Sequence, residues 1–551
     1  MRFSRRIMCV MLAASIVGTL VTGCARPKAT AAKDPAVAAR LENLNLKGFP
    51  IVKQPVTLNF LVSTNAFQKD YANTYVWKKY EEKTNVHINW TTVPSNNIKE
   101  KRNLILASGQ NLPDAFYRCG FGSVDVQKYG SQGLFVKMND LIDKYMPNLK
   151  TLLDKMDSVR KGLPTVDGSI YSLPGVSNCP EGEIGVKFFL NKKFMDKTGT
   201  SMPETLDDFY NVLKAMRDKD ANGNGKADEV PLTSTTWSNI ANPLKGAFGL
   251  MNKGSRHTNV DLDPKTNQLR FIPTTNEFRQ LLEFLHKLYS EKLLDNEIFE
   301  MSNSGSGTTN VIAKSNADLV GAFAYTNLAI VSTKKTGDFI GIDKALKGPN
   351  GDQLWSYMRA NTVSKGSFTM SKDCKYPEVV ARWMDYWYSE EGARMFYLGV
   401  EGETYKKNAD GSYEYLPQVC DTSDGESFDA VISKTTPYCG GSNPVIQLSA
   451  YFKGGEMDPV PKKAAYDMLK YVPKERWDYF TYTDEEADRQ ASLEADMFAG
   501  YYDIIIPQFI SGEKPLNDQA WAEYCQKFKE LGLDEYMKIY NSGYDRYKNA
   551  K

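Results

Sequence analysis

Residues 218–229, with the sequence DKDANGNGKADE, place oxygen-bearing side chains at nearly every second position around two glycines. Calcium takes roughly six to eight oxygen ligands at about 2.3–2.6 Å, and a tight loop with alternate inward side chains can supply them. A register that starts at Asp218 matches the EF-hand pattern but puts Lys226 at the ninth position, where a cation would face the metal. A register that starts at Asp220 avoids this conflict.

The second register predicts a structural calcium site that would fix the loop without touching a substrate. A polar Asn-Gly turn that binds no ion is the alternative. The ligands that this register predicts are Asp220, Asn222, Asn224, the carbonyl of Lys226 and Asp228.

Strand-like and helical stretches alternate after residue 55. We expect strands at 56–62, 86–93 and 114–117, and helices at 75–83 and 97–108. This alternation implies parallel strands with helices on the faces of the sheet. Ligands of such sheets lie beyond the carboxyl ends of the strands. Asn65 and Arg118 are therefore candidate ligand contacts, because each closely follows an apolar strand.

The composition excludes some classes of function. The 68 Lys and Arg residues nearly balance the 67 Asp and Glu residues, which gives a formal net charge of +1. No basic block offers the clustered cations that phosphate contacts require, so nucleic-acid binding is not expected. Only three histidines are present and they lie far apart, which disfavours a zinc hydrolase or a Ser-His-Asp enzyme.

The amino terminus has the features of an export signal. Arg2, Arg5 and Arg6 precede an apolar run at 7–21, which is short for a bilayer span but suits a signal-peptide core. The following VTGC at 21–24 resembles a bacterial lipobox, in which Cys24 is lipidated after cleavage. We expect a signal peptide at 1–23, a lipidated cysteine with a flexible tether at 24–54, and a protein anchored at the extracellular face of the membrane. An ordinary signal peptide with a chance cysteine is the alternative.

The remaining six cysteines form no CxxC pair, which leaves a metal cluster or a thioredoxin-type site unsupported. Cys420 and Cys439 are the closest pair in the sequence. An exported protein can form that disulfide, and buried free thiols are the other possibility.

Several motifs resemble those of the extracellular solute-binding proteins of carbohydrate-uptake ABC transporters. The first two are ASGQNLPD at 107–114 and GSIYSLP at 168–174. Others are LNKKF at 190–194, MPETLDDF at 202–209, GETY at 402–405 and the Trp- and Tyr-rich ending at 521–547, the last two similar to the lipoprotein branch. The loop that starts at Asp220 also resembles the calcium loop of alginate-binding relatives, where an adjacent Asp and Glu close the site. This resemblance implies that Glu229 is a calcium ligand together with Asp228.

The resemblance implies an α/β fold of the type II periplasmic-binding-protein class, with two lobes, crossing hinge segments and a ligand cleft between the lobes. The first lobe would take residues 55–172 and 363–415. The second lobe would take residues 173–362 and 416–551.

A sugar ligand presents hydroxyl groups to planar polar side chains and a C–H face to aromatic rings. Aromatic residues in loops after strands or in the hinge are therefore candidates. They are Tyr171, Trp237, Tyr325, Trp355, Tyr357 and Tyr438. Trp383 and Trp387, four residues apart on one helix face, are expected in the core.

Together with the export signal, the resemblance implies a monomeric, lipid-anchored protein that captures an oligosaccharide and delivers it to the transmembrane subunits of an ABC permease. A secreted carbohydrate-active enzyme is an alternative, because the chain has many carboxylates, although no pair stands out in a strand-end motif. A sensory binding protein without transport is a further alternative.

Overall fold

The computed structural model describes residues 35–550 except 66, 69, 422, 424–427 and 439. It contains a first unit in which α1 (Pro35–Asn43) is described, and a compact second unit from Leu44 onward. The predicted signal peptide and Cys24 lie outside the described residues. The predicted tether ends earlier than expected. Ile51 and Val52 are fully buried and the Ile51 N–H donates to the carbonyl of Thr84, so residues 44–54 belong to the compact unit.

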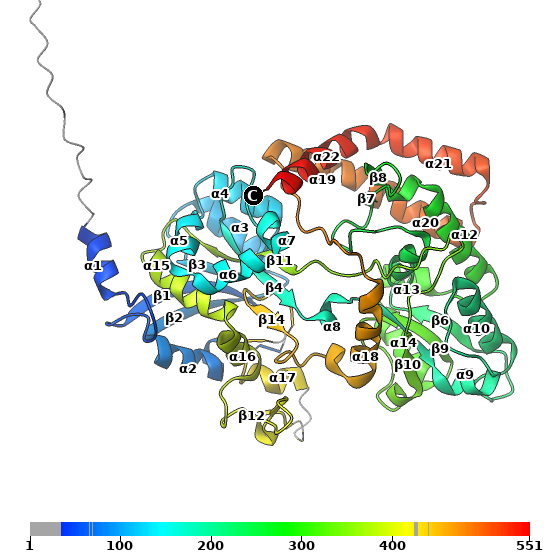
Figure 1. The fold of residues 1–551 in the computed structure, drawn as a ribbon, viewed down its shortest axis with the longest axis horizontal. Helices are drawn as coiled ribbons and strands as arrows, with labels where there is room; N and C mark the ends of the chain where they lie inside the picture. Colours follow the sequence, from blue (N-terminus) through cyan, green and yellow to red (C-terminus); the bar gives the residue numbers. More distant parts are fainter. Residues whose placement is uncertain are drawn as a thin grey trace, which may run out of the picture. The chain divides into compact units, whose positions relative to one another are not determined.

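The first lobe is built on a six-stranded sheet of order β14-β4-β11-β3-β1-β2 (Figure 1). β1 pairs in parallel with β2 and β3, β14 pairs in parallel with β4, and β11 is antiparallel to both of its neighbours. The strands are β1 (Val56–Thr64), β2 (Val86–Pro94), β3 (Ala115–Phe121), β4 (Ser172–Asn178), β11 (Thr362–Met370) and β14 (Ile446–Leu448). The strands and helices predicted near the start of this lobe are confirmed.

Helices cover both faces of this sheet. They are α2 (Tyr75–Thr84), α3 (Ile98–Ser108), α4 (Ser123–Ser131), α5 (Asn139–Tyr145), α6 (Pro147–Lys155), α7 (Asp157–Gly162), α15 (Pro377–Asp385), α16 (Glu390–Leu398) and α17 (Phe428–Ser433). Between β1 and α15, Phe60, Trp77, Trp90 and Trp383 form a continuous aromatic cluster with ring centroids 5.1–6.5 Å apart. Trp383 and Trp387 are buried, which confirms their predicted place in the core.

The second lobe is built on a four-stranded sheet of order β10-β5-β9-β6. The strands are β5 (Lys187–Asn191), β6 (Val230–Ser234), β9 (Val320–Tyr325) and β10 (Phe339–Gly341). Its helices are α9 (Lys192–Thr198), α10 (Leu206–Asp218), α11 (Ser238–Leu244), α12 (Asn276–Ser290), α13 (Ile298–Ser304), α14 (Gly307–Asn316) and α18 (Pro459–Met468). Helix α10 begins with a capping box, in which Thr205 and Asp208 accept from each other's backbone N–H, and its apolar face is buried.

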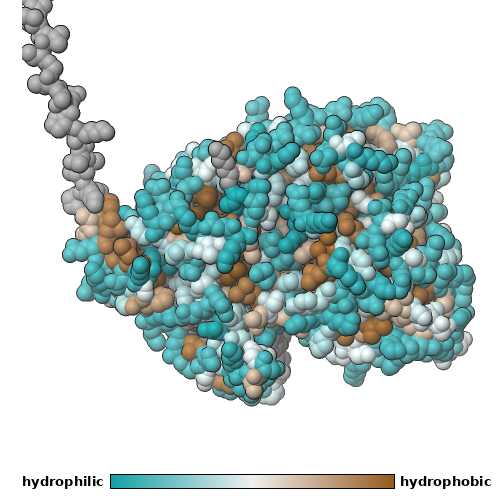
Figure 2. All heavy atoms as spheres, in the orientation of Figure 1, coloured by the Kyte–Doolittle hydropathy of each residue, from teal (hydrophilic) through white to brown (hydrophobic). Residues whose placement is uncertain are grey.

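The carboxyl-terminal helices pack on the second lobe and touch the first through α4 and α7 (Figure 1). They are α19 (Asp484–Glu494), a π-helical turn (Ala495–Tyr502), α20 (Asp503–Ser511), α21 (Asp518–Glu530) and α22 (Leu533–Asn549). Two small hairpins complete the unit, β7 (Val260–Leu262) with β8 (Leu269–Phe271), and β12 (Tyr405–Lys407) with β13 (Tyr413–Tyr415). In Figure 2 the visible face of the unit is mainly hydrophilic, with hydrophobic side chains in scattered spots.

The chain changes lobe at different places from those expected. The expected boundary at 172/173 falls inside β4, which pairs with β11 and β14 and so belongs to the first sheet. The chain crosses after β4, through the short helix α8 (Pro180–Glu183). Residues 416–448, expected in the second lobe, also stay with the first, because β14 pairs with β4 and the Tyr75 N–H donates to the carbonyl of Lys434.

A half-buried histidine ties the carboxyl-terminal helices to the crossing region. His257 Nε2 lies 2.8 Å from the carbonyl oxygen of Asp478, Nδ1 contacts the hydroxyl of Tyr540, and the ring stacks on Phe480 at 4.0 Å. The Nε2–H tautomer satisfies both contacts, with the Tyr540 hydroxyl as donor to Nδ1. Burial lowers the pKa of His257 from 6.5 to about 4.

The folded pKa of His257 lies below the unfolded one, so the unfolded chain binds more protons as the pH falls below 6.5. We expect the wild type to lose about 2 kcal/mol more stability than the non-titrating variant His257→Gln between pH 7 and pH 5. Denaturant unfolding of both chains at each pH measures this difference. Equal losses in the two chains would show that His257 does not titrate in this way.

Candidate functional site

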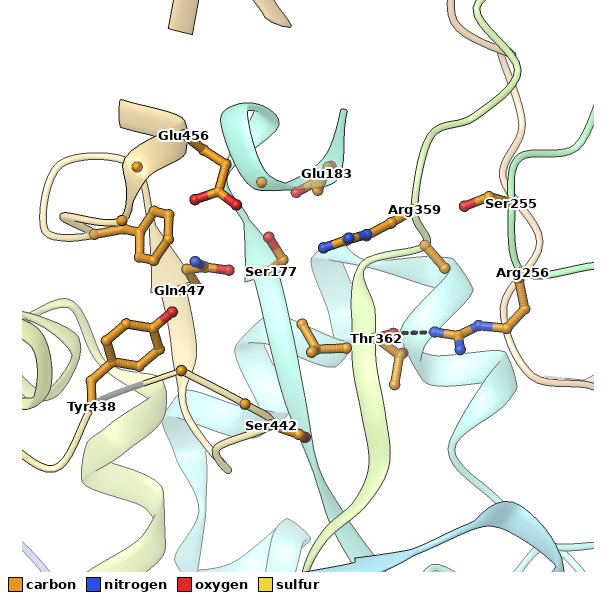
Figure 3. A pocket seen from close by; sticks show the side chains of 18 of the residues that line it. Ser177, Glu183, Ser255, Arg256, Arg359, Thr362, Tyr438, Ser442, Gln447 and Glu456 are labelled. Atoms are coloured by element: carbon orange, nitrogen blue, oxygen red, sulfur yellow. Dashed lines mark hydrogen bonds between the residues drawn. The ribbon is translucent and has the colours of Figure 1, made fainter. Parts of the chain in front are cut away.

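A cavity of about 650 Å³ opens between the two lobes, where the crossing segments meet. Figure 3 shows it from close by, with side chains from both lobes turned toward it. Small-molecule sites usually occupy about 300–1,000 Å³, so the size is suitable for a ligand. Its polar and charged lining residues are Ser177, Glu183, Ser255, Arg256, Arg359, Thr362, Tyr438, Ser442, Gln447 and Glu456.

One edge of the first sheet forms a wall of the cavity. Ser177 near the end of β4 lies beside Gln447 of β14 in the parallel register, and Thr362 begins the antiparallel strand β11. All three side chains therefore reach the same edge. Arg359 precedes β11 in the second crossing, and Glu183 ends α8 in the first crossing.

A glycine turn before β14 forms another part of the wall. Gly440 and Gly441 both have positive φ values (84° and 75°), which glycine adopts without strain. The Arg118 guanidinium donates to the carbonyl of Gly440 at 3.2 Å and to Gln68 Oε1 at 3.1 Å. Arg118 thus supports this turn from behind.

Aromatic rings lie on the side of the cavity that belongs to the first lobe. The Tyr438 ring lies 4.9 Å from that of Tyr397 and 5.7 Å from that of Phe452, both buried. Tyr357, from the second crossing, also lines the cavity and packs close to Gly185. These rings offer flat apolar surface beside the polar groups.

Two of the four charged lining residues are held by other groups. Glu183 is 3% exposed and its Oε2 accepts from Arg476 at 2.5 Å. Arg256 donates to the carbonyl of Thr362, and its guanidinium lies 4.0 Å from the centre of the Tyr479 ring.

Hydroxyl groups on the cavity wall also lack partners. Ser177 Oγ and Thr362 Oγ1 are buried without a hydrogen-bond partner in the described part of the chain. A buried polar atom without a partner is unfavourable by about 1–3 kcal/mol. Water or ligand hydroxyls at this wall would relieve that penalty.

Three of the eight predicted ligand contacts come together here. Tyr357 and Tyr438 line the cavity, and Arg118 supports its glycine turn. Asn65 does not line the cavity; it lies in the loop after β1, where its Oδ1 accepts from the Phe67 N–H.

The other four predicted contacts do not line the cavity. Tyr171 packs against Gly130 of α4, and Tyr325 ends β9 beside the core of the second lobe. Trp237 directly precedes α11, and its ring lies 6.4 Å from that of Tyr502. Trp355 is 2% exposed and packs at 6.2 Å from Phe188 in the core of the second lobe.

Sequence reasoning missed Arg359, Glu456, Gln447 and Ser177. Arg359 stands three residues before the strand-like segment at 362–370, and Glu456 follows the glycine pair 454–455, as a residue of a tight turn often does. These local signals indicated loops but not the cavity, because residues 177, 359 and 456 meet only through the fold.

The loop at 220–229 has the geometry of an oxygen-lined turn. Asp220 Oδ1 accepts from the N–H groups of Gly223 and Gly225 at 3.0 and 3.3 Å. The side-chain oxygens of Asn222 and Asn224 accept from the backbone N–H two residues later. These turns are those of a short loop closed on its own side chains.

The carboxylates at the end of this loop complete its set of oxygen donors. The amides of Asn222 and Asn224 both donate to Asp228 at 3.0 Å and lower the pKa of that carboxyl. Glu229 Oε2 is buried without a hydrogen-bond partner in the described part of the chain. That orphaned oxygen fits a cation. Lys197, whose Nζ lies 3.8 Å from Asp220, is a basic neighbour.

No cluster of three or more His, Cys, Asp or Glu side chains able to hold a metal occurs among the described residues. Three of the six predicted calcium ligands, the amides of Asn222 and Asn224 and the carbonyl of Lys226, are not of these residue types. A disulfide between Cys420 and Cys439 is one of the two possibilities that the sequence predicts for these cysteines. Cys420 has a free thiol in the structure, and Cys439 lies outside the described residues. No helix in the described ranges is both long enough and apolar enough to cross a membrane.

Residues 66–394 match the model of the bacterial extracellular solute-binding protein family. The fructooligosaccharide ABC transporter substrate-binding protein FusA of Streptococcus pneumoniae serotype 4 is 28% identical over 526 residues, which covers 91% of this chain and 92% of that protein. Lipoprotein LipO of Bacillus subtilis strain 168 is 27% identical over 345 residues, 60% of this chain and 63% of that protein.

Several solved structures of solute-binding proteins have a similar fold. FusA of S. pneumoniae in complex with kestose matches with a TM-score of 0.68 and 25% identity, over 90% of this chain and all of that one. An EF-hand mutant of FusA with fructo-nystose matches with a TM-score of 0.66. An HMO-binding solute-binding protein from Bifidobacterium longum infantis matches with a TM-score of 0.73 and 21% identity, over 90% of this chain and 99% of that one. The predicted two-lobed α/β fold is confirmed.

Proposed function

Because the chain belongs to the bacterial extracellular solute-binding proteins and is a sugar-binding component of an ABC transporter rather than an enzyme, we propose that it captures an oligosaccharide between its lobes and delivers it to the permease. The observation that supports this most strongly is the interlobe cavity, where aromatic rings stand beside unpartnered polar groups. FusA is named for fructooligosaccharides and its structure holds kestose, which supports an oligosaccharide ligand.

The cavity offers both types of contact that a sugar needs. Tyr438 and Tyr357 supply flat surface for a C–H face, and Arg359 and Gln447 supply polar groups for hydroxyls. Arg118 positions the turn beside Tyr438. Contacts to both lobes at once favour the closed arrangement of the lobes, and a ligand shifts the equilibrium by its difference in affinity for the two states.

We propose that Cys24 carries the lipid and holds the binding unit at the extracellular face of the membrane, as a monomer. The VTGC motif and the similarity to a protein named as a lipoprotein support this anchor. An anchor of two acyl chains gives stable attachment. The permease subunits would then meet the closed lobes at the membrane.

Thermal unfolding of residues 25–551 with a panel of oligosaccharides tests the capture step. A ligand at about 100 times its dissociation constant adds about 2.7 kcal/mol to the stability of the folded state. We expect a clear shift with one class of oligosaccharide, and chromatography should recover that sugar unchanged. Cleavage of the sugar would contradict a binding function without turnover.

We propose further that the loop at 220–229 binds calcium with the ligands predicted from the sequence. The orphaned Oε2 of Glu229 and the carboxylates of Asp220 and Asp228 support this donor set. One solved structure of FusA is that of an EF-hand mutant, which supports an ion-binding loop in a related protein. The ion would fix the turn between α10 and β6.

Calcium should therefore stabilise the chain. At about 100 times its dissociation constant, calcium is expected to raise the free energy of unfolding by about 2.7 kcal/mol, and a chelator should remove that gain. Glu229→Gln should lose most of the response, because it removes a charged oxygen ligand. Thermal unfolding with calcium and with chelator measures both effects.

Asp410→Asn is the matched control, since Asp410 also closes a polar turn, through Ser412, but in the β12–β13 hairpin. It should respond to calcium as the wild type does. A wild-type chain whose unfolding temperature is the same with calcium and with chelator would refute the site.

A further inference from the structure

The cavity wall holds one cation and one anion that make no short polar contact with another described side chain. Arg359 and Glu456 form no side-chain hydrogen bond and no ion pair with any residue in the described ranges, whereas Arg256 and Glu183 are both engaged. Figure 3 shows the ends of Arg359 and Glu456 pointing into the same space beside Ser177. Their charges are opposite, so the two groups together leave the cavity electrically balanced.

The layer behind this wall holds charges of both signs, and Lys187 in it interacts electrostatically with Glu456 and Glu181. The buried ammonium of Lys187 donates to the carbonyls of Ile184 and Gly185 at 2.9 and 3.0 Å. The buried carboxylate of Glu181 accepts from the Ser449 hydroxyl at 2.7 Å. Arg476 compensates Glu183, and Arg118 faces backbone and amide oxygens rather than the cavity. The four charged side chains that line the cavity, two arginines and two glutamates, therefore sum to zero and offer an anionic ligand no net positive charge.

We infer that the cavity selects neutral oligosaccharides and excludes uronate oligosaccharides, with Arg359 and Glu456 as the specificity-determining pair; this inference rests on the proposed function. Adjacent hydroxyls of a neutral sugar can accept from the guanidinium and donate to the carboxylate at the same time. Both charged groups then keep partners when water leaves the cavity. Each such contact involves a charged group, which makes it stronger than a neutral hydrogen bond.

A uronate would satisfy only one member of the pair. Its carboxylate could bind Arg359, but Glu456 points into the same space and would face a like charge. Like charges brought together in a site that excludes water are strongly unfavourable. Specificity of this kind arises from the repulsive group as much as from the attractive one.

The test compares ligands of equal length on residues 25–551. Titration calorimetry is run with neutral oligosaccharides of fructose, galactose, glucose, mannose and xylose, with trigalacturonate, and with a neutral tripeptide. We expect at least one neutral sugar to bind at least about a hundredfold more tightly than trigalacturonate. Trigalacturonate binding as tightly as the best neutral sugar would overturn the inference and leave the proposed function standing. Binding of the tripeptide alone, or of none of these compounds, would overturn both.

Variants assign the selection to the two residues. Glu456→Gln and Arg359→Gln should each lower the affinity for the neutral sugar by about tenfold or more, since each removes a charged hydrogen-bond group. Glu456→Gln should also reduce the ratio of the affinity for the neutral sugar to the affinity for trigalacturonate by about tenfold. Glu300→Gln and Arg489→Gln, on exposed surface, are the matched controls and should change neither affinity.

Unchanged selectivity in a folded Glu456→Gln variant would overturn the role of this pair. If that variant does not fold, Arg359→Gln and the wild-type comparison decide. Unfolding temperatures of the free variants distinguish a lost contact from a lost fold.

Discussion

Arg476→Ala is expected to lower the free energy of unfolding by about 3–5 kcal/mol, the usual loss when one partner of a buried ion pair is removed. Glu183 would remain buried at 3% exposure with its charge uncompensated. Arg476 also donates to the carbonyl of Arg359 and to Asn361 Oδ1, both at 3.1 Å. It therefore joins three segments that pass between the lobes, and denaturant unfolding should detect its loss.

A second ion pair provides the control. Arg489 and Glu535 lie 2.6 Å apart, nearly the same as Arg476 and Glu183, but both side chains are 47% exposed. Arg489→Ala should change stability by no more than about 1 kcal/mol. The double variant Arg476→Met/Glu183→Gln should regain part of the loss, because no uncompensated charge stays buried. Equal effects of Arg476→Ala and Arg489→Ala would contradict the role given to the buried pair.

Trp383→Ala is expected to destabilise the first lobe by about 3–5 kcal/mol through the cavity it leaves. Trp383 is 1% exposed, stacks on Trp77 at 5.7 Å and meets Phe60 edge-on at 5.6 Å. Removal of the indole takes away these ring contacts together with the buried apolar area. Unfolding followed by circular dichroism measures the loss.

Trp237→Ala is the matched control for this substitution, because Trp237 is only half-buried and its nearest described ring is 6.4 Å away. It should destabilise the chain clearly less than Trp383→Ala. The affinity of folded Trp383→Ala for a sugar should remain close to that of the wild type, since the residue does not line the cavity. A large loss of affinity with little loss of stability would show that Trp383 acts at the site.

The start of the fold follows directly from local sequence. The apolar residues of β1 and the amphipathic pattern of α2 determine these elements within a few residues. β14 could not be predicted in this way. It has only three residues, and it belongs to the first sheet because it pairs with β4, about 270 residues earlier in the chain. That distant pairing also explains why the expected lobe boundaries were misplaced.

The candidate site shows the same limit. Tyr357 and Tyr438 line the cavity as their positions near strands and turns suggested, but Trp355, only two residues from Tyr357, is buried in the second lobe. Aromatic type and loop position do not distinguish a wall of a cavity from a core. Arg359 and Glu456 are ordinary loop residues in the sequence, and only the three-dimensional arrangement brings their charges together.

A crystal structure of the chain with the sugar that gives the largest thermal shift tests the central claim most directly. We expect the sugar to occupy the space between the lobes, with a ring against Tyr438 and hydroxyls within hydrogen-bond distance of Arg359 and Glu456. A sugar bound outside that cavity, for example in the surface depression beside Lys79, Arg394 and Tyr405, would contradict it.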